Sequence, residues 1–140
     1  MVRDHRGHVI FYYSEFLGEQ TNNFAELFAI AKGLELCLER NCMRVWVETD
    51  SQIALTLISN KTKGYWSLQP LLLRIRKAIT HVEVRFSHTF REANAAADFL
   101  ANQECTNKGS LIATTEPHSG KLKGILRLDR LEYPYIRCKR

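Results

Sequence analysis

The spacing of hydrophobic positions predicts alternating strands and helices along most of the chain. Apolar residues at helical spacing predict a helix over about 23–40, and strict alternation predicts strands over 43–49 and 82–90. Aromatic and β-branched residues predict a strand over 8–17, after a hairpin turn at 3–7. Further helices are expected over 51–59, 68–80 and 93–105. This order indicates an α/β fold, in which sites gather at the carboxyl ends of strands.

The last 35 residues differ from the rest in composition. Residues 106–120 are rich in Thr, Ser, Gly and Asn, which predicts a linker between a domain at 1–105 and a basic tail at 121–140. The tail holds seven Lys/Arg and two Asp/Glu, a balance of +5 that equals the net charge of the whole chain. Such a tail either attracts a polyanion through counterion release or only keeps the chain soluble, and charge alone does not separate the two.

Length and composition narrow the class of protein. A chain of 140 residues with 45% hydrophobic residues has room for one domain with a real core. No apolar run approaches the ~18 residues of a membrane span, and the first residues lack a secretory signal. We therefore expect a nuclear or cytoplasmic monomer that does not bind membranes. The four cysteines show no CxxC pair or metal-ligand spacing, so we expect reduced thiols.

Three acidic residues are candidates for chemistry, and each has an ordinary explanation. Glu26 lies at the edge of the apolar stripe of its helix, where a carboxylate needs a cation, a donor or a metal; a nearby Arg or Lys is the usual partner. Asp50 ends a strand in the string VETDSQ, where helix capping would explain it. Asp98 lies in an alanine-rich helix, where a solvated face would explain it.

Together, three acids from three elements of an α/β domain predict one site for a hard cation bound by carboxylate oxygens. Two-metal phosphodiester chemistry needs such a cluster, to activate a water and to stabilise the leaving oxygen.

The strings around these acids resemble a known family. TNNFAEL (21–27), ETDSQ (48–52) and REANAAADFLAN (91–102) are similar, in the same order, to motifs of type 1 ribonuclease H. The resemblance is strongest to plant ribonuclease H-like domains associated with reverse transcriptases and derived from retroelements, and it covers about residues 2–105. Four motifs in order, counting the LRDxxG-like start at Val2-Arg3-Asp4, are a specific signal.

The resemblance implies a mixed sheet flanked by helices, and cleavage of RNA in an RNA/DNA hybrid with Mg²⁺ or Mn²⁺ and no small-molecule cofactor. Glu26, Asp50 and Asp98 match metal ligands of the family. The family's contacts to the hybrid fall on Thr21, Asn22, Asn23, Ser51 and Gln52. Such polar groups suit a minor groove that is recognised by shape. Helix capping is the alternative role for the two asparagines, one of which we expect to serve both purposes.

The chain departs from the family pattern at its start. Family members begin with a strand that carries an Asp-Gly and lies mid-sheet, and neither Asp4 nor Glu15 replaces that Asp. Without the strand, Val45 and Val47 should lack one neighbour. We therefore expect the first strand to be absent, the chain to be a truncated product or an incomplete gene reading, and its cleavage of hybrid to be weak or nil.

Other positions are less decisive. Many members hold a mobile His where this chain has Arg91, which cannot shuttle protons but can bind phosphate or stabilise developing charge. His88 lies on an apolar stripe and is expected to be a packed core histidine. The segment with Lys61, Lys63, Tyr65 and Trp66 either contacts nucleic acid or is an ordinary loop in which Trp66 anchors the next helix.

Two other functions compete with a metal-dependent endoribonuclease. A non-catalytic module could keep the fold and bind nucleic acid or another partner after losing the complete metal site. A DEDD-type exonuclease is disfavoured, because its first two acids should lie close together on one strand, and Glu26 and Asp50 do not.

Overall fold

The computed structural model of the chain describes residues 1–59, 65–90, 94–113 and 119–130, with the backbone alone at 103–107 and 129–130. It divides into two compact units, each of which is described by itself. Unit 1 comprises Met1–Phe16 and Arg91–Arg140, and unit 2 comprises Leu17–Phe90.

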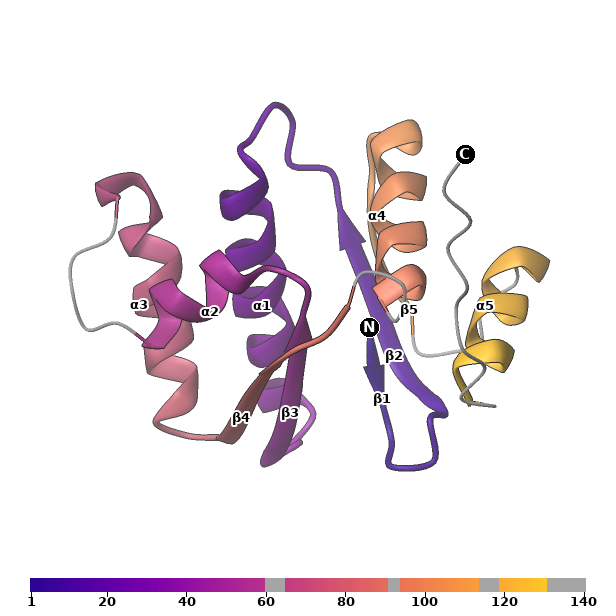
Figure 1. Cartoon of the computed structure of the whole chain (residues 1–140), viewed down its shortest axis with the longest axis horizontal. Coiled ribbons are helices and arrows are strands. Elements are labelled where there is room, and N and C mark those ends of the chain that lie inside the picture. The colour runs from indigo at the N-terminus through magenta and orange to yellow at the C-terminus, as the bar shows by residue number, and fades with distance from the viewer. Residues whose placement is uncertain (60–64, 91–93, 114–118, 131–140) are drawn as a thin grey trace. The chain divides into compact units, whose positions relative to one another are not determined.

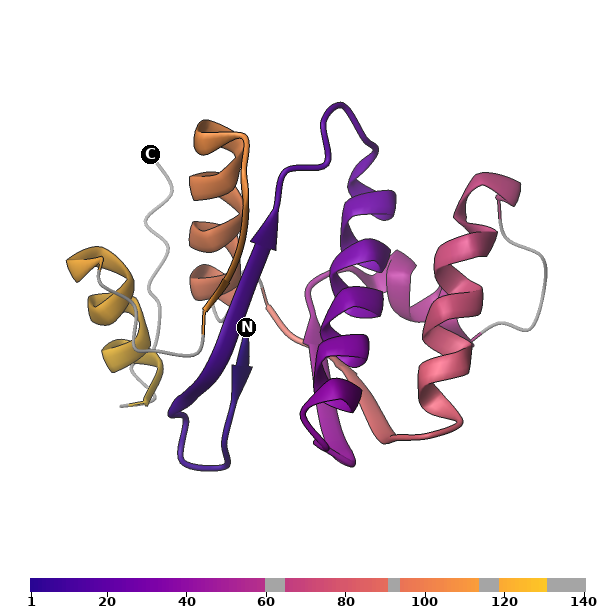
Figure 2. The ribbon, with the colours of Figure 1, turned by 180° about the vertical axis from the view of Figure 1, so that it is seen from behind.

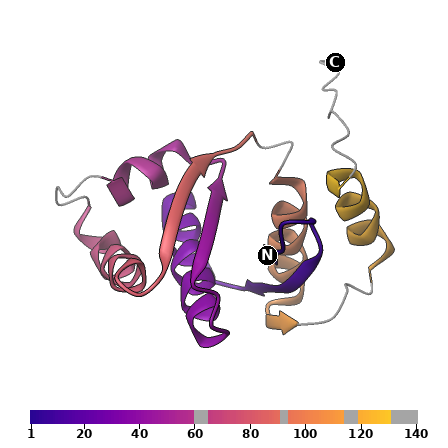
Figure 3. The ribbon, with the colours of Figure 1, turned by 90° about the horizontal axis from the view of Figure 1, so that it is seen from below.

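Unit 2 is a two-stranded parallel sheet with helices. Its elements are α1 (Asn22–Glu39), β3 (Arg44–Thr49), α2 (Gln52–Ser59), the 3-10 turn η1 (Trp66–Leu68), α3 (Gln69–Ile79) and β4 (Glu83–His88) (Figure 1). β3 and β4 pair in register, from Arg44 opposite Glu83 to Thr49 opposite His88. Figure 3 shows the two strands side by side and pointing the same way. The predicted elements of this segment are all present, with ends shifted by a few residues.

The core of unit 2 lies between one face of this sheet and the helices. Leu27, Leu34, Leu72 and Ile75 are almost completely buried where α1 and α3 pack together. Val45 and Val47 of β3, with Val84 and Phe86 of β4, pack against that cluster. The alternate residues of β3 (Arg44, Trp46 and Glu48) are exposed, as the predicted alternation requires. Figure 2 shows α1 and α3 from the other side.

An ion pair joins α1 to α3 at the edge of this core. The Arg74 guanidinium donates two hydrogen bonds to the Glu35 carboxylate, from Nε to Oε1 and from Nη2 to Oε2, each 2.7 Å long. The guanidinium carbon of Arg74 also lies 5.4 Å from the centre of the Phe28 ring. A forked pair of this kind fixes the orientation of both side chains as well as the distance between the helices.

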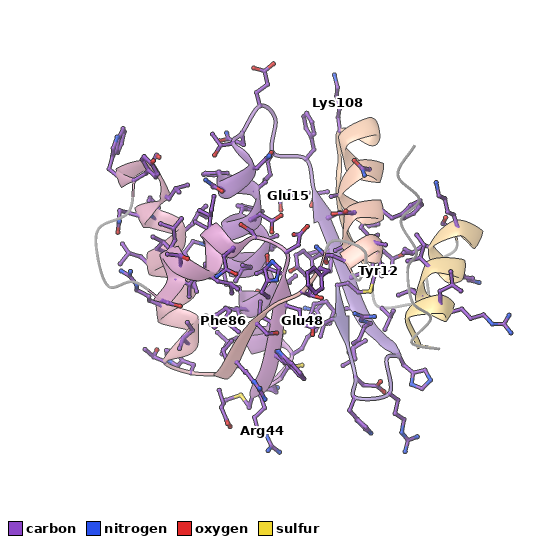
Figure 4. The ribbon with its side chains drawn as sticks, in the orientation of Figure 1. Tyr12, Glu15, Arg44, Glu48, Phe86 and Lys108 are labelled. Carbon is purple, nitrogen blue, oxygen red and sulfur yellow. The ribbon has the colours of Figure 1, made fainter. Side chains whose placement is uncertain are left out.

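Unit 1 is a three-stranded antiparallel sheet with two helices. Its elements are β1 (Val2–Arg3), β2 (Val9–Glu15), α4 (Ala95–Asn107), β5 (Ser110–Ala113) and α5 (Gly120–Arg130). The strand order is β1-β2-β5. The predicted hairpin turn is confirmed, because Gly7 N–H donates to Asp4 O at 3.0 Å and Asp4 N–H donates to His8 O at 2.9 Å. Tyr12 of β2 (labelled in Figure 4), Ala96 and Leu100 of α4, and Leu122 and Leu126 of α5 form the buried cluster.

Two elements of unit 1 contradict the expected linker and tail. Ser110–Ala113, within the expected linker, is a strand paired with β2, with Ile112 opposite Tyr13. Gly120–Arg130, at the start of the expected tail, is a helix whose Leu122 and Leu126 are buried. In both cases a few apolar residues gain enough burial to order a segment whose average composition is polar.

The described strands therefore form two sheets, flanked by helices, as an α/β fold of the predicted class. Within the described part of the chain, β3 pairs with β4 and with no second strand.

Candidate metal site

Glu26 of unit 2 is held at the end of β3 by a hydrogen bond. The Thr49 hydroxyl donates to Glu26 Oε2 at 3.2 Å, and the same Thr49 oxygen accepts the Ser51 N–H at 3.1 Å. Thr49 is only 3% exposed, and Glu26 is half-buried. A buried hydroxyl that donates to one group and accepts from the other fixes both. The second turn of α1 is therefore tied to the junction of β3 and α2.

Asp50 lies inside this junction. It follows Thr49 at the carboxyl end of β3 and is half-buried. The next residue, Ser51, caps α2 as predicted, because its Oγ accepts the Ala54 N–H at 3.1 Å. The structure therefore joins Glu26 and Asp50 through one intervening residue, Thr49, although they are far apart in the sequence.

The polar residues at the two helix starts flank the same junction. Thr21 is the N-cap of α1, and its Oγ1 accepts the Phe24 N–H at 3.2 Å. The expectation that Asn22 or Asn23 caps this helix is wrong, because both are already within its first turn. Asn22 and Gln52 are exposed at the starts of α1 and α2. First-turn N–H groups at such starts, together with exposed amides, can bind anionic oxygens.

Asp98 belongs to the other unit. It lies in the first turn of α4 and is half-buried. Its helix packs on unit 1 through Ala96 and Leu100, which are 4% and 2% exposed. Within the residues that the structure describes, no three His, Cys, Asp or Glu side chains are close enough together to form a metal-binding group. The structure thus places two of the three predicted ligands in unit 2 and one in unit 1.

Comparison with protein families identifies the chain. A family model described as reverse transcriptase-like matches residues 1–104. The chain belongs to this reverse transcriptase-like family. Its ribonuclease H-like character, expected from the motifs, is thereby confirmed. Comparisons with curated proteins and with solved structures found no match.

The structure of this ribonuclease H-like domain does not place His88 in the core, where it was expected. It is exposed, and its ring lies 5.9 Å from that of Phe90, which is 75% exposed. The expected core position is therefore wrong. The apolar stripe of β4 is covered by helices only as far as Phe86, and His88 is the last residue of the strand.

The expectation that Trp66 anchors the next helix is also wrong. Trp66 is 88% exposed and Tyr65 is 74% exposed, whereas Leu68 is 4% exposed and packs in the core of unit 2. Leu68, and not Trp66, therefore anchors the start of α3. Arg91, Lys61 and Lys63 lie outside the described residues.

Thr49 is the site residue that sequence reasoning missed. It occupies the same buried stripe of β3 as Val45 and Val47, where it was interpreted only as part of the alternation. A polar residue on an otherwise apolar stripe, directly before the candidate Asp, was the available signal. Its partner Glu26 could not be inferred, because the two residues are 23 positions apart and meet only in the folded unit.

No helix in the described part of the structure has the length and apolar character needed to cross a membrane.

Proposed function

We propose that this domain binds RNA/DNA hybrids and cleaves their RNA strand with a divalent cation, Mg²⁺ or Mn²⁺, to which Glu26 and Asp50 of unit 2 contribute ligands. The observation that carries the proposal is the chain of hydrogen bonds from Glu26 through Thr49 to Ser51. It holds one candidate ligand against the strand end that supplies another. In a ribonuclease H-like chain, that placement is what a shared metal site requires.

The donor set of unit 2 suits such a cation. Glu26 and Asp50 offer carboxylate oxygens, the preferred ligands of Mg²⁺, which takes one or two carboxylates and keeps several waters. When bound, the cation would lower the pKa of a water and offset charge on the scissile phosphate. Thr49 would orient Glu26 through its hydrogen bond. A ligand that is oriented before the cation binds loses less side-chain entropy on binding.

The starts of α1 and α2 would hold the hybrid. Thr21, Asn22 and Asn23 at one helix start, and Ser51 and Gln52 at the other, offer amides, hydroxyls and backbone N–H groups. Such groups bind phosphates and 2′-hydroxyls without reading bases. Arg91 would bind a phosphate as a cation. It is suited to stabilising developing charge but not to carrying protons.

The test separates binding from cleavage. A labelled hybrid is incubated with the chain and Mg²⁺ or Mn²⁺, and binding is followed in parallel by fluorescence anisotropy. Asp50→Asn should abolish metal-dependent cleavage and leave hybrid binding within about twofold. Glu83→Gln, which removes an exposed acid of β4, is the matched control and should cleave like the unaltered chain.

Three acids of this chain match the family's metal ligands, and none replaces the Asp of the family's first strand. We therefore expect slow cleavage, most easily seen with Mn²⁺ at high enzyme concentration. Cleavage retained by Asp50→Asn would remove the site assignment. Hybrid binding with no metal-dependent cleavage under any of these conditions would favour the alternative, a non-catalytic nucleic-acid-binding module.

A further inference from the structure

The helix α5 combines a buried apolar side with an exposed basic side. Leu122 and Leu126 are 1% and 3% exposed and pack with α4 and β2. Lys121, Lys123 and Arg127 are exposed, and they are the charged side chains that the structure describes on this helix. Figures 1 and 3 both show α5 beside α4. The apolar side thus fixes α5 within unit 1 and leaves Lys123 and Arg127 exposed, whereas Lys121 Nζ lies 5.7 Å from the centre of the Phe99 ring of α4.

This helix lies outside the part of the chain that matches the family model, which ends at residue 104. Its basic side therefore lies outside the family match. It is also an ordered one, because Lys123 N–H donates to Ser119 O at 3.0 Å in the first turn and the buried leucines hold the next two turns.

A glycine in the middle of the exposed side is an independent observation. Gly124 lies inside α5, where glycine lowers helix stability relative to alanine. None of the described atoms around it comes within 4 Å of a Cβ built at this position, so packing among the described residues does not require glycine. Glycine on an exposed helix side, with cations at the preceding position and three residues further on, leaves room for a ligand to approach the backbone.

We propose that the exposed side of α5 is a second contact for double-stranded nucleic acid, in which Lys123 and Arg127 bind backbone phosphates next to Gly124. The two cations are four residues apart and therefore neighbours on the helix surface, so they can act on adjacent phosphates of one strand. The inference rests on the proposed function for the identity of the nucleic acid, an RNA/DNA hybrid.

The burial of the leucines selects this partner over a membrane. A basic amphipathic helix binds anionic lipid by inserting its apolar side into the bilayer. In α5 that side is already covered by unit 1, through Leu122 and Leu126. Among the described side chains of α5, those that remain exposed are cationic apart from Leu128, which is 44% exposed. Such a surface suits phosphates in solution and reads no sequence.

The experiment measures how salt weakens binding of a blunt RNA/DNA hybrid to the full chain, by fluorescence anisotropy between 50 and 300 mM KCl without divalent cation. The variant is Lys123→Gln combined with Arg127→Gln. The matched control, Arg6→Gln combined with Lys77→Gln, removes two exposed cations elsewhere. Circular dichroism establishes that each chain is folded, and glutamine is a good helix former.

We expect the α5 variant to bind about tenfold or more weakly at 100 mM salt, and the slope of log K against log[salt] to become shallower by roughly 0.9 for each lost phosphate contact. The control should keep both values. Gly124→Gln, which adds bulk beside Arg127 on the exposed side of α5, should stay folded and also bind more weakly. An unchanged slope in the α5 variant, or unchanged binding by Gly124→Gln, overturns the inference.

Two further results separate this inference from the proposed function. If the chain binds hybrid through α5 but shows no metal-dependent cleavage, the inference stands and the catalytic proposal fails. If Asp50→Asn abolishes cleavage while the α5 variant binds normally, the catalytic proposal stands and the inference fails. Binding of vesicles with 30% phosphatidylserine that depends on Lys123 and Arg127, with hybrid binding unaffected, would also overturn it.

Discussion

In unit 2, hydrogen bonding holds the candidate ligand Glu26 in place. In unit 1, apolar packing holds the helix that carries Asp98. In unit 2, Thr49 is bonded to both Glu26 and Ser51. In unit 1, Ala96 and Leu100 of α4, which flank Asp98 in the sequence, are buried in one cluster with Leu122 and Leu126 of α5. Hydrogen bonds restrict the rotamers of the side chains that they join, whereas apolar packing fixes the position of the helix as a whole.

The two units should therefore respond to different substitutions. An apolar truncation near Asp98 should cost much stability. A polar substitution of nearly the same shape near Glu26 should cost less stability but have a larger effect on chemistry.

The largest expected effect is on the packing of unit 1. Leu100→Ala removes a side chain that is 2% exposed and should lower the free energy of unfolding by about 2–5 kcal/mol. Leu128→Ala, at a residue that is 44% exposed, is the control and should change it by about 0.5 kcal/mol or less. Urea unfolding followed by circular dichroism measures both. Equal effects of the two substitutions would contradict the packing of α4 described above.

The next effect is on the polar junction of unit 2. Thr49→Val keeps the shape of the side chain but removes the hydroxyl, so we expect a loss of about 1–3 kcal/mol. Thr49→Ser restores the hydroxyl and should recover most of it. The loss should shrink when Glu26 is already Met, which cannot replace the carboxylate acceptor, because the two residues share one hydrogen bond. Full additivity in this double-mutant cycle of unfolding free energies would show that the bond contributes nothing.

A smaller effect is expected at the ion pair between α1 and α3. The hydrogen bonds from Arg74 lower the pKa of Glu35 below its ordinary value of 4.5. The pair therefore stabilises the fold above that value, and its contribution is lost as the pH falls through the lowered pKa. Both side chains are 36% exposed, so Arg74→Met should cost about 1 kcal/mol or less at pH 7.

The measurement for this pair is urea unfolding of both chains at pH 7 and at pH 3. The stability difference between the unaltered chain and Arg74→Met should be smaller at pH 3. A difference that grows on acidification would contradict the sign of the pKa shift.

The smallest effect concerns a buried thiol. Burial of Cys37, which is 1% exposed, raises its pKa from 9.0 to about 11. The folded state then keeps a proton that the unfolded state loses, so stability should fall as the pH rises from 9 towards 11. At pH 8, Cys37 should react with iodoacetamide far more slowly in the folded chain than in urea, as peptide mass mapping can show. Equal rates in both states would contradict its burial.

The contrast between the units also explains what the sequence could predict about the fold. In unit 2, long periodic segments identified every strand and helix, because burial there follows the local pattern of Val45 and Val47 and of the α1 stripe. β5 was missed because its four residues gain order only from pairing with β2. In α5, Leu122 and Leu126 have helical spacing, but the positive charge around them favoured a basic tail. Their packing partners in α4 and β2 could not be inferred from the local sequence.

For the site, motif matches supplied Glu26, Asp50 and Asp98, because an acid within a matching string needs no tertiary information. The role of Thr49 depends on a partner 23 residues away and could not be predicted. The exposure of His88 and Trp66 was mispredicted for a related reason, since an apolar or aromatic pattern does not show where helix coverage ends.

The most direct test of the central claim is a Mn²⁺ titration of the isotope-labelled chain, followed by paramagnetic broadening of its amide signals. If Glu26 and Asp50 share one metal site, amides near both should broaden at the same low metal concentration, and Asp50→Asn should weaken both effects together. Broadening at other acids, such as Glu39 or Glu83, with no effect near these two residues, would contradict the account.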